Sequence, residues 1–160
     1  MRHILRLLSA MVLVTAACDG DSVLGTAPEI LELSAARERW ADSEPAEYQF
    51  NYTRSCFCPA LTNVRVTVRN GVVISARVIA TGVELAPAER ANIPTIDGLF
   101  DVIESAIDQR AHELRVQYDA QMGFPMSIAL DYREMIADDE IYYEVKEVMS
   151  TAACCSEGRM

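Results

Sequence analysis

The sequence is poor in the residues on which many catalytic and nucleic-acid-binding sites depend. Histidine occurs twice in 160 residues, at His3 and His112, and the chain has no Gly-rich phosphate loop or nucleophile elbow. Arginine and lysine number 14 against 24 acidic residues, which gives a net charge of −10. Because polyanions repel an acidic chain, we expect no nucleic-acid partner.

Long hydrophobic runs are also scarce. The apolar stretch 7–14 is far shorter than the roughly 20 residues that a membrane-spanning helix needs. It follows two arginines and leads through small residues to Cys18, an order typical of a signal peptide. The ending resembles the lipobox of bacterial lipoproteins, although Thr15 stands where leucine is usual. We expect residues 1–17 to be removed and Cys18 to be lipidated, with an ordinary secretory peptide as the alternative.

Either kind of leader exports the rest of the chain. Residues 18–28 are polar and are expected to tether one domain at 29–155, with 156–160 as a tail. Because two or more acyl chains anchor a protein stably, lipid on Cys18 would hold the domain to a membrane of the bacterial cell envelope. Without lipid the domain would be soluble, in the periplasm or secreted. The expected partners are the membrane and an unknown envelope protein or small ligand.

Hydrophobic periodicity predicts an α+β domain in the order helix, three strands, helix, three strands. Asn70-Gly71 predicts a hairpin, and Thr95 can cap a helix whose periodicity runs to Leu114, with the loop 81–94 before it. We expect one mostly antiparallel sheet with two helices on one face. The other expected segments are a helix at 30–40 and strands at 48–53, 64–69, 72–79, 114–118, 126–132 and 141–149.

The two halves of the predicted domain also resemble each other weakly. Tyr52 aligns with Tyr118, and Pro59 aligns with Pro125. In each half a helix precedes a strand with an aromatic residue and a turn that contains proline. A tandem duplication and a chance match both stay open.

Four cysteines remain after Cys18, and we expect them to form disulfides, which persist outside the cytoplasm. Cys56 and Cys58 are separated by one residue, and Cys154 and Cys155 are adjacent. Zinc sites usually separate their cysteines by two to four residues, and thioredoxin-like sites need Cys-x-x-Cys at a helix start. A redox-active pair and a metal site are the alternatives to structural disulfides.

The pairing of these cysteines is open, because four cysteines permit three connectivities. On an extended strand the Cα atoms of Cys56 and Cys58 would lie about 6.5–7 Å apart, at the upper edge of disulfide reach. A bond between them would need a bend in the chain. A bridge from Cys58 to Cys154 is easier to form from straight strands and would fix the C-terminal segment.

The acidic and aromatic residues are expected to be structural. Asp138, Asp139 and Glu140 suit a solvated turn better than a calcium site, and Asp119 suits a turn and Asp131 a solvent-facing strand position. Histidine 112 is expected to end the second helix. The larger aromatic residues are expected in the core or half buried on the sheet: Trp40 and tyrosines 48, 52, 118, 132, 142 and 143. We therefore assign no catalytic residue, metal ligand or cofactor, and expect a protein that is not an enzyme.

Several motifs together resemble the bacterial family described as domain of unknown function 6174, over about Trp40 to Val148. They are YQFNY, CFCP, VRVTVRNGVV, TIDGLFDVIESAI, VQYDAQMGFPMSIALDY and DDEIYYEV. The resemblance implies a small secreted or lipid-anchored protein and supplies no activity or catalytic residue. We expect a binding or interaction module at the cell envelope. The alternative is an exported thiol redox or metal-handling protein that uses Cys56 and Cys58.

Overall fold

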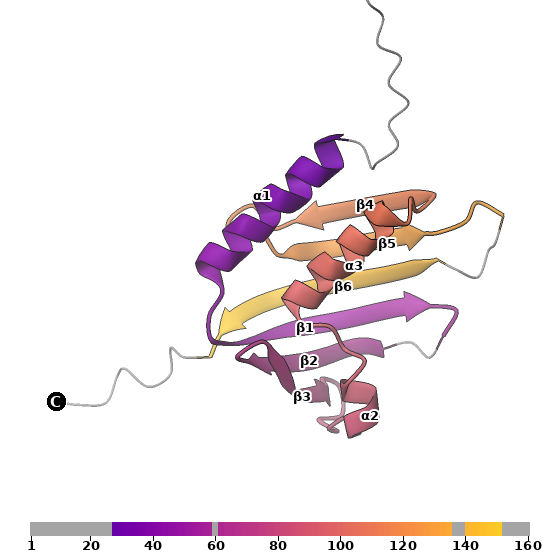
Figure 1. Cartoon of the computed structure of the whole chain (residues 1–160). Coiled ribbons are helices and arrows are strands. Elements are labelled where there is room, and N and C mark those ends of the chain that lie inside the picture. Colours follow the sequence, from indigo (N-terminus) through magenta and orange to yellow (C-terminus); the bar gives the residue numbers. More distant parts are fainter. Residues whose placement is uncertain (1–26, 59–60, 136–139, 152–160) are drawn as a thin grey trace, which may run out of the picture.

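The computed structural model describes residues 27–58, 61–135 and 140–151 (Figure 1). The predicted order of helix, three strands, helix, three strands is confirmed, with one short helix added between the halves. The elements are α1 (Ala27–Ser43), β1 (Glu47–Cys56), β2 (Leu61–Arg69), β3 (Val72–Val78), α2 (Pro87–Arg90), α3 (Ile96–Asp108), β4 (Glu113–Tyr118), β5 (Pro125–Asp131) and β6 (Ile141–Ser150).

The six strands form one antiparallel sheet in the order β3-β2-β1-β6-β5-β4. The predicted α+β class is therefore confirmed. The first strand of the chain and its last strand lie side by side at the centre, where Tyr52 is opposite Val145. In the first half the strand after the helix is central, whereas in the second half it is the edge strand β4. The halves thus occupy different positions in the sheet, and duplication and chance match both stay open.

The core lies between one face of the sheet and the helices α1 and α3, which both lie on that face (Figure 1). Tyr48, Phe50 and Tyr52 alternate along β1 with half-exposed residues, because successive strand residues point to opposite faces. The ring of Trp40 on α1 packs edge-on against Tyr48 with centroids 5.2 Å apart. One face of the sheet is thus covered and the other is open to solvent, as is common in antiparallel sheets.

Local signals placed several boundaries correctly. Thr95 caps α3, since its Oγ1 accepts a hydrogen bond from the backbone N–H of Gly98 at 3.1 Å. Asn70 and Gly71 have φ of 50° and 73°, and this pair of positive values is the one that a two-residue type I′ hairpin needs. These features depend on residues within a few positions of one another.

Two boundaries differ from the predictions. Helix α3 ends at Asp108, and the chain turns at Arg110, where φ is 55°. His112 therefore lies after the helix, and Leu114 belongs to β4. The stretch predicted as a loop holds α2, a single helical turn that begins at Pro87, where proline's fixed φ suits a first helical position.

Helix α1 is held close to the β4–β5 turn at Gly123. This glycine has φ of 83° and is buried against α1. A Cβ atom there would collide with the carbonyl oxygen of Ala36 and would lie 2.8 Å from Cβ of Arg39. The hydroxyl of Ser43 also donates to the carbonyl oxygen of Met122, at 3.3 Å, in the same turn.

Candidate functional site

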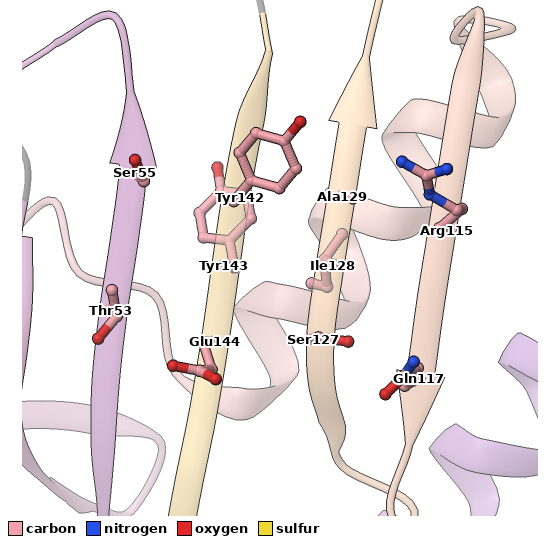
Figure 2. A pocket seen from close by; sticks show the side chains of 10 residues that line it. All are labelled: Thr53, Ser55, Arg115, Gln117, Ser127, Ile128, Ala129, Tyr142, Tyr143 and Glu144. Atoms are coloured by element: carbon pink, nitrogen blue, oxygen red, sulfur yellow. The ribbon is translucent and has the colours of Figure 1, made fainter.

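The open face of the sheet carries a hollow of about 430 Å³ across four of its strands, β1, β6, β5 and β4 (Figure 2). Most of its side chains come from alternate positions of each strand, on the face that the helices leave uncovered, and Ile128 and Tyr143 also border it. The strand register places them in two rows of direct neighbours. The first row is Ser55, Tyr142, Ala129 and Arg115, and the second is Thr53, Glu144, Ser127 and Gln117.

The hollow arises from a difference in side-chain size along each row. On the open face strand β5 presents the short side chains of Ser127 and Ala129, whereas its neighbours contribute longer side chains on both sides. Figure 2 shows Tyr142 standing on β6 and Arg115 on β4, with the short side chains of β5 between them. The hollow is therefore a depression between two taller strands.

Ion pairs with neighbours on the same strand neutralise the charges around the hollow. Arg115 Nη1 lies 2.6 Å from Glu113 Oε1, and Lys146 Nζ lies 2.7 Å from Glu144 Oε1. Exposed pairs of this kind add at most about 1 kcal/mol to stability. They nevertheless leave the hollow without net charge, so the groups that it presents to a ligand are mainly polar and uncharged.

Tyr142 is the exposed aromatic residue of the hollow, with 45% of its surface accessible. Its hydroxyl donates a hydrogen bond to Glu140 Oε2 at 3.1 Å. This hydrogen bond, followed by the charge of Glu140, raises the pKa of Tyr142 above its usual value. The phenol therefore stays protonated at neutral pH, and its ring is oriented by Glu140.

The structure joins Cys56 to Cys58 in a disulfide, with Cα atoms 5.1 Å apart. This differs from the bridge between Cys58 and Cys154 that straight strands would favour. The physical reason is that β1 ends at Cys56 and the chain bends at the next two residues, which supplies the bend that a bond between these cysteines needs. Cys18, Cys154 and Cys155 lie outside the described residues.

The acidic residues singled out in the sequence have structural roles where they are described. Asp119 Oδ1 accepts hydrogen bonds from the backbone N–H groups of Gln121 and Met122, at 3.0 and 2.7 Å, which is the predicted turn role. Asp131 Oδ1 accepts from Arg133 N at 2.9 Å at the end of β5. Asp138 and Asp139 lie outside the described residues.

The remaining candidates are dispersed. His112 is exposed before β4, and Trp40, Tyr48 and Tyr52 are buried in the core as predicted. Over 27–58, 61–135 and 140–151, no three histidine, cysteine or acidic side chains gather in a way that could hold a metal ion. Sequence reasoning missed the hollow, for which the only signal is the run of small residues at Ser127 and Ala129.

Among the described residues, no helix combines the length and the apolar character that crossing a membrane requires. A family model described as "Family of unknown function (DUF6174)" matches residues 32–150, from the second turn of α1 to the end of β6. A search of curated proteins gave no match. A search of solved structures gave none either.

Proposed function

This chain belongs to the DUF6174 family, whose function is unknown, and we propose that it is a lipid-anchored binding module of the bacterial cell envelope. In this proposal the open face of the sheet binds a small polar ligand, and the protein carries out no catalysis. The observation on which the proposal depends is the uncharged polar hollow with an exposed tyrosine ring on that face.

The leader supports the anchoring part of the proposal. Residues 1–17 have the basic start, short apolar stretch and small residues of a signal peptide, and Cys18 follows directly. The polar segment after Cys18 then leads into α1. Cell fractionation of wild type and a Cys18→Ala variant tests this part. The wild type should stay with membranes and the variant should not, and a variant that remains in the membrane fraction would refute lipid anchoring at this residue.

The chemistry of the hollow supports a ligand with many hydroxyl groups, such as a saccharide unit. Thr53, Ser55 and Ser127 carry hydroxyls that both donate and accept, and Gln117 adds an amide. The ring of Tyr142 offers a flat apolar surface beside them, suited to the C–H face of a sugar ring. Small-ligand sites commonly combine such a ring with a few polar groups in a concave surface.

NMR titration of the purified full chain with glucose, N-acetylglucosamine and their disaccharides tests the binding part. Shift changes should concentrate on the two rows of the hollow. Tyr142→Ala should weaken binding about tenfold, as expected when a central aromatic contact is lost. Met149→Ala is the matched control, because Met149 is on the same strand and is 46% exposed but does not line the hollow. Equal losses in the two variants would contradict the assignment.

We propose that the protein carries out no catalysis because of the state of its candidate nucleophiles and its candidate base. Cys56 and Cys58 are bonded to each other, and His112 is exposed on the surface. A disulfide has no thiolate to attack a substrate. These residues therefore support a binding role better than acyl transfer or hydrolysis.

The exposed position of the Cys56–Cys58 disulfide favours one second candidate, an exported thiol redox protein. Phe57 between the two cysteines is 82% exposed, and Cys58 is exposed as well, so a partner thiol could reach the bond. A thiol-exchange assay with reduced glutathione, using the Cys56→Ser variant as the control, distinguishes the two roles. Catalytic turnover of a disulfide substrate that the variant lacks would favour the redox function over the binding module.

A further inference from the structure

Arg54 lies on the covered side of the sheet, where most of its neighbours are apolar or aromatic. It follows Tyr48, Phe50 and Tyr52 at alternate positions of β1, and these three are completely buried. Arg54 itself is half buried. An arginine thus continues the row of side chains that forms the centre of the core.

A second hollow, of about 220 Å³, surrounds this arginine on the covered side. Tyr143 of β6 is its direct cross-strand neighbour, and the ring of Tyr143 lies 6.4 Å from that of Tyr52. The loop before α3 forms the opposite wall through Asn92 and Pro94. Asn92 is fixed there because its amide nitrogen donates to the carbonyl oxygen of Ala88 at 2.8 Å. This hollow lies on the other side of the sheet from the one on the open face, and Tyr143 borders both.

Four buried polar groups have no hydrogen-bond partner in the described part of the chain, and two of them belong to residues that line this hollow. These two are the hydroxyl of Tyr52, whose residue is 0% exposed, and Nε of Arg54. Tyr48, four residues before Tyr52, shows the usual arrangement, since its hydroxyl accepts from the backbone N–H of Ile96 at 3.3 Å. Because buried polar groups in proteins are nearly always hydrogen-bonded, the orphaned pair indicates a missing partner.

The charge of Arg54 also lacks a partner. In the described residues no carboxylate forms an ion pair with Arg54, whereas most other cationic side chains have one: Arg37, Arg65, Arg69, Arg77, Arg90, Arg115 and Lys146. An acidic chain has ample carboxylates to pair with, so a partly buried arginine beside two tyrosines is unusual. A desolvated charge without a counterion is costly.

The tyrosines of the hollow stay protonated. Burial raises the pKa of Tyr52 and of Tyr143, and the positive charge of Arg54 opposes this rise only in part. Both phenols therefore present an O–H group at neutral pH. The hollow thus offers donors and a positive charge but no carboxylate.

We propose that this hollow binds a small oxyanion, a carboxylate or phosphate group, with the guanidinium of Arg54 as its counterion and the Tyr52 hydroxyl as a donor. The planar fork of arginine matches the geometry of both anions. The volume admits a small molecule or one anionic group of a larger one. Entry is from the side of Ala91 and Asn92, which are exposed. The site is independent of the saccharide site proposed above.

The test is thermal denaturation and calorimetric titration of the purified full chain, with sodium acetate and inorganic phosphate as probes against sodium chloride at equal ionic strength. The melting temperature should rise with at least one oxyanion beyond the chloride control, by mass action on the folded state. A response to phosphate alone assigns phosphate, a response to acetate alone assigns carboxylate, and a response to both assigns oxyanions in general. No response to either probe would overturn the proposal and would leave an ordered water as the partner of Tyr52.

Three variants separate the site from general charge effects. Arg54→Gln should weaken anion binding about tenfold or more, and Arg54→Lys should weaken it less, because the charge remains without the fork. Arg77→Gln is the matched control, since Arg77 is an exposed, ion-paired strand residue and should bind anions like wild type. Equal anion responses in Arg54→Gln and Arg77→Gln would overturn the site.

The Tyr52→Phe variant tests whether the hydroxyl binds the anion or only stabilises the fold. Because the phenol oxygen has no protein partner, its removal should not lower the melting temperature in chloride. It should nevertheless reduce the anion-induced rise. A variant that loses stability in chloride and keeps the full anion response would contradict the proposed donor role.

Discussion

Gly123→Ala should destabilise the domain because the substitution has two separate energetic costs. The first is conformational: Gly123 has φ of 83°, a region in which a residue with a Cβ atom is strained by roughly 1–2 kcal/mol. The second is steric, since the new methyl group would collide with the carbonyl oxygen of Ala36 and crowd Cβ of Arg39 at 2.8 Å. Overpacking of this kind costs about 1–3 kcal/mol. The expected loss is therefore about 2–5 kcal/mol.

Gly71→Ala separates the two costs. Gly71 has a similar φ of 73°, but no atom lies within 4 Å of the position that its Cβ would take. The control should therefore lose only the conformational part, about 1–2 kcal/mol. Urea denaturation followed by circular dichroism gives both free energies of unfolding. If the two variants lose equal stability, the close approach of α1 to the turn at Gly123 contributes nothing, and the reasoning is refuted.

Three further perturbations test the strands and the disulfide. Burial, followed by the charge of a nearby glutamate, raises the pKa of Tyr118 to about 12. The contribution of Tyr118 to stability should therefore be complete below about pH 10 and be lost as the pH rises through about 12. An alkaline titration of stability in which Tyr118→Phe matches wild type would contradict this. A hydrogen bond from Arg69 lowers the pKa of Glu47 below 4.5. The contribution of Glu47 to stability should therefore be present above that pH and be lost below it. Glu47→Gln should remove this part of the fall in stability at acid pH. Replacing Cys56 and Cys58 by serine opens a ring of only three residues, so the free energy of unfolding measured in urea should fall by less than about 2 kcal/mol. A loss near about 4–5 kcal/mol would instead indicate a disulfide between distant parts of the chain.

Much of the fold could be predicted because its elements depend on nearby residues. The alternation of Tyr48, Phe50 and Tyr52 predicts a strand with one buried face, and that face is the one that the helices cover. Thr95 and Asn70-Gly71 act within one turn of the chain, so their predicted roles are confirmed. The end of α3 was misplaced because Leu114 fits a helical period and a strand equally well.

The candidate site could not be predicted in the same way. Ser127 and Ala129 become the floor of a hollow only because β6 and β4 lie on either side of β5 with larger side chains in register. Likewise, Arg54 meets Tyr143, which is almost 90 positions away in the chain, only through the pairing of β1 with β6. No local pattern encodes such a pairing.

By itself the sequence determined which segments form helices and strands and which side of each strand is apolar, because these properties follow from the order of residues a few positions apart. It also carries the proposed leader and Cys18, on which the proposed location of the protein depends. Only the tertiary structure decided that β1 lies beside β6, that the chain bends after Cys56, and that Arg54 has no acidic partner in the described residues. These features arise from contacts between distant segments, which the packing of the whole core selects.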